Sequence, residues 1–174
     1  MSAPETIPLA DGRLITFEVG GVFYALPIAA VAEVTDVARV AAVPGVPRGV
    51  AGVMNYHGDA LPVLERGALL PGSAIEETSP SHLLVLAECP DDASRYGLGV
   101  DSICGLTDGA AATAFGDDPV AERRPIEGRI VNILDPKRLL ARAVEVIEQS
   151  VGSKGSTGSA DGTFPVEAIQ GEEL

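Results

Sequence analysis

The chain has 174 residues, a hydrophobic content of 46% and a formal net charge of −13. This length suits one domain or a pair of fused small subdomains. The hydrophobic content is enough for a core, which must be mainly aliphatic because tryptophan is absent and aromatic residues make up 4% of the chain. A surface this acidic repels phosphate backbones, so we expect no binding to nucleic acid.

The location of the protein follows from what the chain lacks. No apolar run approaches the roughly 20 residues that cross a bilayer, so we predict no membrane insertion. The N-terminal segment MSAPETIPLADGR has no basic start followed by an apolar block, and so does not resemble a secretory signal. We therefore expect a cytoplasmic protein, in which Cys89 and Cys104 are free thiols.

Three regions differ in composition. Residues 1–12 are predicted to be a flexible arm, and residues 13–149 the folded domain. Residues 150–174 form a Gly/Ser-rich linker and an acidic tail, which we expect to be disordered. A short recognition peptide is the alternative for this tail, because Phe164, Val166 and Ile169 are embedded in it.

A tight hairpin is predicted at the start of the domain. Leu14–Val19 and Val22–Leu26 flank Gly20-Gly21, a dipeptide suited to a two-residue turn. Pairing across this turn places six apolar residues on one face, which we expect to be a core face. The predicted pairs are Val19 with Val22, Phe17 with Tyr24, and Ile15 with Leu26.

A short helix is predicted after this hairpin. Pro27 suits the first turn of a helix, and Ile28–Asp36 continues it. Ile28, Val31 and Val34 recur at intervals of three along one side, and Glu33 lies off that stripe. Arg39–Val43 is expected to be another strand.

A second hairpin is predicted from Val50–His57 and Ala60–Glu65. Gly58-Asp59 would form its turn, and glycine in the first central position fits type II′. Both faces are largely apolar, so we expect burial on both sides. A short turn of helix at Leu69-Leu70 and a loop over residues 71–81 follow.

Four strands and a final helix are predicted in the second half of the domain. Strands are predicted at His82–Glu88 and Arg95–Asp101, around a polar loop at Pro90–Ser94, and then at Ser102–Thr107 and Gly128–Leu134. Residues 108–125 show no clear pattern. Asp135 is expected to cap a final helix that begins at Pro136. Its predicted inner stripe is Leu139, Leu140, Ala143 and Ile147.

The chain offers little for catalysis. His57 and His82 lie on different predicted hairpins, without the spacing of a metal site. The phosphate-binding loop and nucleophile-elbow motifs are absent, and Gly97-Leu98-Gly99 lacks the helix of a dinucleotide site. We therefore expect a non-enzyme with no catalytic residue, metal or cofactor. A groove lined by aliphatic side chains would instead suit a partner's helix or hairpin.

The order of several segments resembles the bacterial chemotaxis coupling proteins, the CheW-like family. The resemblance runs from about Leu14 to Ile147. Its strongest segments are FEVGGVFYALP (17–27), VAEV (31–34), VPGVP (43–47), GVMNYHG (52–58), LPV (61–63), YGLGVD (96–101) and LDPKRLL (134–140).

This resemblance implies a mainly β fold of two intertwined, SH3-like five-stranded barrels, with a short helix after the first hairpin and a C-terminal helix. It also implies a non-catalytic adaptor between the cytoplasmic tips of methyl-accepting chemoreceptors and the regulatory domain of a CheA-type histidine kinase. One alternative is an adaptor of a chemosensory system that controls pilus motility or gene regulation. A less favoured one is an enzyme or small-ligand binder that uses His57, Asn55 and Asp59 in a cleft.

The resemblance also indicates where partners bind. Val31 and Glu33 match positions implicated in partner contacts, and Gly52 matches one implicated in receptor contact. With their neighbours they define the predicted partner-binding residues Val31, Glu33, Val34, Gly52, Asn55 and His57.

Three features depart from the family pattern, and Asp101 follows it. His57 stands where the family usually has arginine, which is always charged and can grip a carboxylate with two hydrogen bonds. If Glu33 lies beside His57, we expect a weak pair at neutral pH. Glu65-Arg66 replaces a frequent Asp-Leu, and residues 108–125 are short and atypical. Asp101 matches a Val-Asp pair that we interpret as structural.

Overall fold

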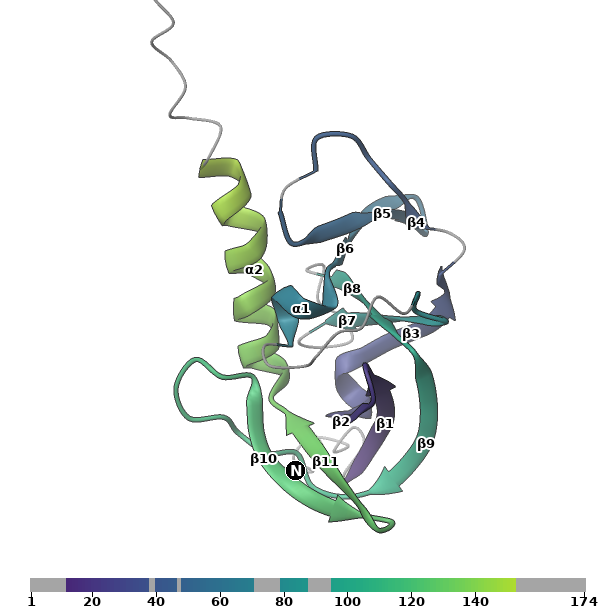
Figure 1. Ribbon diagram of the computed structural model, residues 1–174, viewed down its shortest axis with the longest axis vertical. Coiled ribbons are helices and arrows are strands. Elements are labelled where there is room, and N and C mark those ends of the chain that lie inside the picture. The colour runs from purple at the N-terminus through teal and green to yellow at the C-terminus, as the bar shows by residue number, and fades with distance from the viewer. Residues whose placement is uncertain (1–11, 38–39, 47, 71–78, 88–94, 153–174) are drawn as a thin grey trace, which may run out of the picture.

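The computed structural model describes residues 12–37, 40–46, 48–70, 79–87 and 95–152. These form two curled β-sheets, and the long helix α2 (Pro136–Gly152) runs along one side of the molecule (Figure 1). Several predictions fall outside the described residues. They concern the N-terminal arm to Asp11, the loop over 71–78, Cys89, the polar loop Pro90–Ser94 and the tail from residue 153.

The first sheet combines the two ends of the domain. Its strand order is β10-β11-β2-β1-β9, and β11 runs parallel to β2. The strands are β1 (Arg13–Val19), β2 (Val22–Pro27), β9 (Ser102–Asp108), β10 (Val120–Ile126) and β11 (Arg129–Leu134). Residues that are far apart in sequence therefore close one sheet, so neither half of the domain can complete its sheet alone.

The second sheet is built from the middle of the chain, in the order β3-β7-β8-β6-β5-β4. Its strands are β3 (Val31–Asp36), β4 (Val40–Ala41), β5 (Val50–Tyr56), β6 (Asp59–Leu64), β7 (His82–Ala87) and β8 (Arg95–Val100). The predicted mainly β fold of two intertwined units is confirmed, and the sheets fit small SH3-like barrels. The second sheet has six strands rather than five, because β4 adds a two-residue edge.

The first hairpin has the predicted register. Phe17 pairs with Tyr24, and the remaining pairs are also those expected. Gly20 and Gly21 both have positive φ, 58° and 76°, which glycine adopts without steric cost. The side chains of Phe17 and Leu26 are fully buried, so this face is a core face.

Buried hydrophobic side chains form three clusters. The largest lies between the sheets and joins them to the helices; it includes Phe17, Leu64, Leu98, Leu134 and Leu139. Each sheet also has a smaller cluster of its own. Met54, Leu61, Val63, Leu83 and Val85 belong to the second sheet, and Leu14, Ala25, Val131 and Ile133 to the first.

The predicted short helix after the first hairpin is present, but its predicted extension over Val31–Asp36 is wrong. Only one 3₁₀ turn, η1 (Ile28–Ala30), precedes strand β3, which pairs antiparallel with β7. The three-residue spacing was too short a signal to separate helix from strand. β-Branched residues such as Val31, Val34 and Thr35 favour a strand when a partner strand is available. Strand β7 is that partner.

The second hairpin differs from its prediction in two ways. Tyr56 pairs with Asp59, so His57 and Gly58 are the central turn residues. Their φ angles are 51° and 96°, and positive φ at both positions is the pattern of a type I′ turn rather than type II′. Burial on both sides is also wrong, because Ala51 and Asn55 are exposed while Met54 is buried. Of the strand predicted near residues 39–43, only β4 forms, and Arg39 lies outside the described residues.

The C-terminal helix begins as predicted. The Asp135 carboxylate accepts hydrogen bonds from the N–H of Lys137 at 2.9 Å and of Ala114 at 2.8 Å. Leu139 and Ala143 are buried, and Leu140 and Ile147 pack partly buried against the central cluster. The helix continues through Gly152, beyond the boundary predicted at residue 149. A four-residue helix, α1 (Arg66–Leu69), lies close to the predicted turn at Leu69-Leu70.

Within the described residues, no helix combines the length and the apolar composition needed to cross a bilayer.

Candidate protein-binding site

Glu33 and His57 meet on the surface of the second sheet. The Glu33 carboxylate lies 3.3 Å from His57 Nε2, and the two side chains are 41% and 73% exposed. Strands β7, β8 and β6 separate β3 from β5 in the strand order. The sheet must therefore curl until its β3 edge reaches the β5–β6 turn. Glu33 thus lies beside His57, which is the condition under which the sequence predicted a weak pair.

Tyr56 and Arg95 extend this pair into a small polar cluster. The Tyr56 ring contacts the His57 ring edge-on, with centroids 4.4 Å apart. The Arg95 guanidinium lies 5.5 Å from the centre of the Tyr56 ring, within cation–π range. Partial burial raises the pKa of the Tyr56 phenol, and the nearby Glu33 carboxylate raises it further through its charge and a hydrogen bond. Neutral Tyr56 thus donates to Glu33.

Asn55 shapes the turn that presents His57. Its side-chain oxygen accepts a hydrogen bond from the N–H of Gly58 at 2.9 Å. This bond closes the turn around His57, whose positive φ is uncommon for a residue other than glycine. Asn55 is therefore a positioning residue for His57, as well as an exposed side chain in its own right.

Val31 and Val34 both lie on β3 but differ in burial. Val31 is partly buried against the central cluster, whereas Val34 is 42% exposed. A β-bulge between Val31 and Glu33 shifts the register with β7, so the regular alternation of side chains is broken there. Val31 is opposite Leu86 and Glu33 is opposite Val85, two adjacent residues whose side chains point to opposite faces. Glu33 therefore does not share a face with Val31.

Gly52 is buried and serves the packing of β4 on β5. A Cβ atom at this position would lie 2.6 Å from the carbonyl oxygen of Ala41 and 2.9 Å from Val40 Cγ1. Any side chain would therefore push the β4 edge away. The contribution of Gly52 to partner binding stays a prediction, and the geometry supports an indirect route through the position of β4.

The recess that the described residues form beside the turn is not the deep polar pocket that the ligand-binding alternative requires. It has a volume of about 280 Å³ and takes in Asn55 and Asp59, but its other lining is mainly aliphatic, including Val43 and Val53. His57 does not line this recess. Within the described part of the chain, no three His, Cys, Asp or Glu side chains are grouped closely enough to hold a metal ion.

Some surface residues were missed from the sequence. Tyr56 and Arg95 gave no signal, because only the curl of the sheet brings β8 beneath the turn. Phe115 is 93% exposed in the stretch that had no clear pattern. One sign of this exposure was present in the sequence, which is that Phe115 stands in a segment of Ala, Asp and Gly. Such a segment has no core face in which to bury a large apolar side chain.

The fold defines a structural class: a small β domain built from two curled sheets. A family model for the CheW-like domain matches residues 13–144, and the chain belongs to that family of chemotaxis scaffold and adaptor proteins. The resemblance inferred from sequence segments is confirmed.

The fold is shared with solved structures of other proteins. Scaffolding protein TtCheW from Thermoanaerobacter tengcongensis superposes with a TM-score of 0.58 at 16% sequence identity, over 78% of this chain and 90% of that one. No curated protein sequence matches this chain.

Proposed function

We propose that this chain is a non-catalytic cytoplasmic adaptor that couples chemoreceptor signalling tips to the regulatory domain of a CheA-type histidine kinase. The contact between Glu33 and His57 carries the proposal. These positions were selected by the family resemblance and are 24 residues apart in sequence, yet they meet on one exposed surface. Such convergence supports a shared surface for partners.

The edge strand β3 offers a different kind of contact on each face. On the face opposite to Glu33, Val34 presents an aliphatic side chain, and burying such a side chain fully against a partner contributes about 1.5–3 kcal/mol. The polar cluster of Glu33, Tyr56 and His57 is exposed, so its charges contribute more to orientation and partner choice than to affinity. A few aliphatic anchors with a polar cluster would give reversible binding, as an adaptor requires.

Reconstitution tests the proposal. The full chain should co-sediment with the receptor cytoplasmic fragment and with the CheA-type kinase of the same organism, and should raise receptor control of kinase autophosphorylation. Glu33→Lys should weaken at least one of these contacts. Glu148→Lys, on the exposed face of α2, changes the net charge equally and should leave both intact. Failure of the full chain to bind either partner would contradict the proposal.

A further inference from the structure

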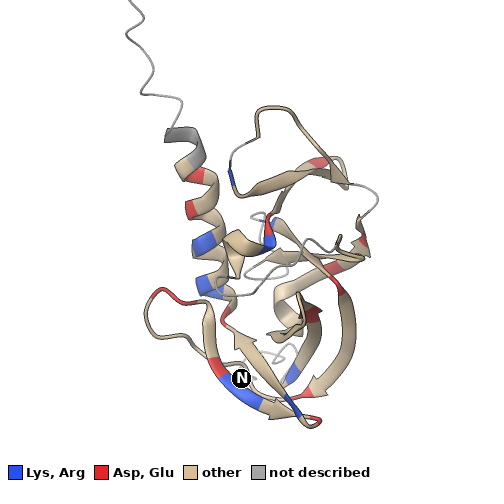
Figure 2. Ribbon diagram, viewed as in Figure 1, with Lys and Arg blue, Asp and Glu red and all other residues tan. Residues whose placement is uncertain are grey.

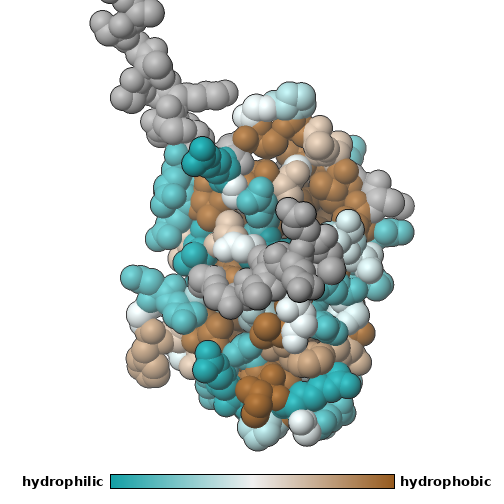
Figure 3. Space-filling model, viewed as in Figure 1, coloured by the Kyte–Doolittle hydropathy of each residue, from teal (hydrophilic) through white to brown (hydrophobic). Residues whose placement is uncertain are grey.

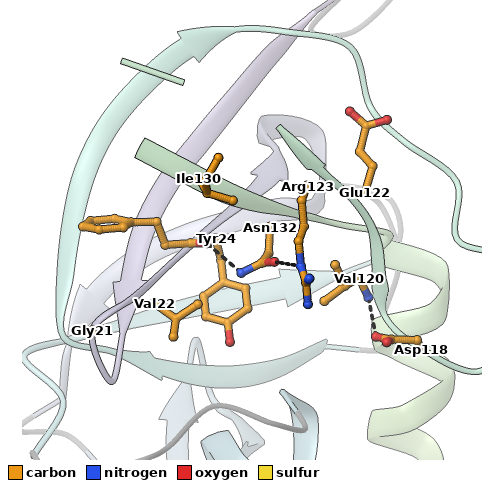
Figure 4. A pocket seen from close by; sticks show the side chains of 10 residues that line it. Gly21, Val22, Tyr24, Asp118, Val120, Glu122, Arg123, Ile130 and Asn132 are labelled. Atoms are coloured by element: carbon orange, nitrogen blue, oxygen red, sulfur yellow. Dashed lines mark hydrogen bonds between the residues drawn. The ribbon is translucent and has the colours of Figure 1, made fainter. Parts of the chain in front are cut away.

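A pocket of about 710 Å³ opens on the first sheet, where β2, β10 and β11 meet, and Arg123 and Asn132 are among its lining side chains (Figure 4). Hydrophobic and hydrophilic residues lie side by side over that end of the molecule (Figure 3). Acidic and basic segments also alternate along the β10–β11 hairpin (Figure 2). The charged residues there are Asp118, Glu122, Arg123, Arg124, Glu127 and Arg129, whose formal charges cancel. This pocket therefore favours neither an acidic nor a basic ligand.

Tyr56, on the second sheet, is the residue around which the polar cluster of the proposed adaptor site is arranged. Its side chain is partly buried against the hydrophobic cluster that includes Met54 and Val85. Glu33 is opposite Val85 in the pairing of β3 with β7, so their side chains share a face. Glu33 and Tyr56 therefore lie beside the same hydrophobic cluster, although β3 and β5 are not neighbours in the sheet.

Three contacts hold the Tyr56 side chain. Its ring meets the His57 ring edge-on, with 4.4 Å between the centroids, and the Arg95 guanidinium lies 5.5 Å from the ring centre. Its hydroxyl group donates a hydrogen bond to the Glu33 carboxylate. A side chain that is held by packing and by three neighbours has few other rotamers, so the hydroxyl is a preorganised donor.

Glu33 therefore has two neighbouring donors of different kinds. The Tyr56 hydroxyl can donate throughout the neutral pH range, because partial burial and the Glu33 carboxylate raise the pKa of this phenol. His57 Nε2 lies 3.3 Å from the carboxylate, but only one of the two nitrogens of a neutral imidazole carries a proton, whereas both do in the protonated ring. Tyr56 is thus the constant donor and His57 the variable one.

His57 is the group of this cluster whose charge changes near neutral pH. The charged groups around it and Tyr56 are Glu33 on β3, Arg95 on β8 and Asp59, which pairs with Tyr56 across the turn. Carboxylates and guanidinium groups keep their charges between about pH 6 and 8, whereas histidine gains most of its positive charge across that range. As the pH falls, a protonated His57 becomes a second, charged donor to Glu33.

We propose that Tyr56 is a positioning residue of the adaptor site, which holds the Glu33 carboxylate for partners while His57 is neutral, and that protonated His57 takes over this role as the pH falls. The carboxylate side chain is 41% exposed and has about four lone-pair sites, so it can accept N–H groups of a partner while Tyr56 holds it. This role rests on the proposed adaptor function and adds a regulation by pH to the same surface.

Binding of the full chain to the receptor cytoplasmic fragment and to the CheA-type kinase tests this role at about pH 8 and about pH 6. Tyr56→Phe removes the hydroxyl and keeps the ring against His57 and Arg95. It should weaken binding of at least one partner about two- to fivefold at the higher pH, and clearly less at the lower pH, where protonated His57 holds Glu33. Each variant is compared with the native chain at one pH, so titration of the partner cancels. Thr113→Val, which removes a hydroxyl at an exposed site outside the cluster, is the matched control and should change nothing.

His57→Gln separates the pH effect from packing. This background has no histidine at the turn to gain a charge, so Tyr56→Phe should weaken binding by the same factor at both pH values. In the chain that keeps His57, an equal loss at both pH values would show a merely structural role and overturn the proposal. Undiminished binding by Tyr56→Phe at the higher pH would also overturn it.

Titration of the Tyr56 phenol tests the contact without any partner. Tyr24 and Tyr96 are buried, so the difference in ultraviolet absorbance between the native chain and Tyr56→Phe isolates the titration of Tyr56. Glu33→Gln should lower the pKa of this phenol, because it removes the charge that helps to raise it. Circular dichroism at each pH checks that the chain is folded. An unchanged pKa would overturn the proposal even if the adaptor function holds. Binding of neither partner would overturn the adaptor function, and the positioning role with it, even if the pKa falls.

Discussion

The Arg66 guanidinium donates a hydrogen bond to the Asp101 carboxylate at 2.5 Å, and the other Asp101 oxygen accepts the N–H of Gly20 at 2.7 Å. Arg66 opens α1, Asp101 follows β8, and Gly20 is in the β1–β2 turn. One carboxylate thus ties the turn of the first sheet to a helix that connects β6 and β7 of the second. The structural interpretation of Asp101 is supported, and Arg66, a departure from the family pattern, is its partner.

This pair should be worth more than a surface ion pair, because the side chains of Arg66 and Asp101 are only 9% and 21% exposed. Arg66→Leu, which restores the residue frequent in the family, leaves the carboxylate partly buried without its cation. We expect a loss of about 1–3 kcal/mol in the free energy of unfolding. Denaturant titration of Arg66→Leu, Asp101→Asn and the double variant measures the coupling. Additive losses would show that the two side chains do not stabilise the fold as a pair.

His57→Arg should strengthen coupling to the receptor or the kinase. Arginine stays charged at neutral pH and can bind the Glu33 carboxylate through two hydrogen bonds, whereas a histidine ring offers that carboxylate fewer hydrogen bonds. We expect binding about two- to fivefold tighter in the reconstituted complex, because the pair is exposed. Glu33→Gln with His57→Arg is the control and should lose the gain. Unchanged or weaker binding by His57→Arg alone would count against a contact role for this turn.

Gly52→Ala should displace β4. The added Cβ would lie 2.6 Å from the Ala41 carbonyl oxygen, which is backbone and cannot rotate away. Such overpacking typically costs about 1–3 kcal/mol. Amide hydrogen exchange should report faster exchange at Val40 and Ala41, while β1 and β2 keep their protection. Ala51→Ser, at an exposed neighbour, is the control. Equal protection of β4 in Gly52→Ala and the native chain would refute this account.

Asp135→Ala should lower stability by removing one oxygen that caps the start of α2 and a second that binds the N–H of Ala114. Losing an N-cap costs about 1 kcal/mol, and the buried N–H of Ala114 also loses its partner. We therefore expect a loss of about 2 kcal/mol in thermal or chemical unfolding. Asp135→Asn keeps one side-chain oxygen and should recover part of the loss. If Asn and Ala behaved alike, capping would not be the cause.

The sequence alone determined the parts of this protein that depend on local rules. Gly20-Gly21 with apolar residues on either side defines one hairpin register, and Asp135-Pro136 defines one helix start. These signals act over a few residues, so neighbouring structure need not be known. The CheW-like segments, read in order, also indicated the family before any coordinates.

Only the tertiary structure decided the rest. The segment after Pro27 could pack as a helix or as a strand, and pairing with β7 made it a strand. A bulge in that pairing placed Val31 and Glu33 on opposite faces. The curl of the second sheet then brought Glu33, Tyr56, His57 and Arg95 together. Such contacts depend on strands separated by tens of residues, whose register is set by burial of the whole sheet rather than by any local pattern.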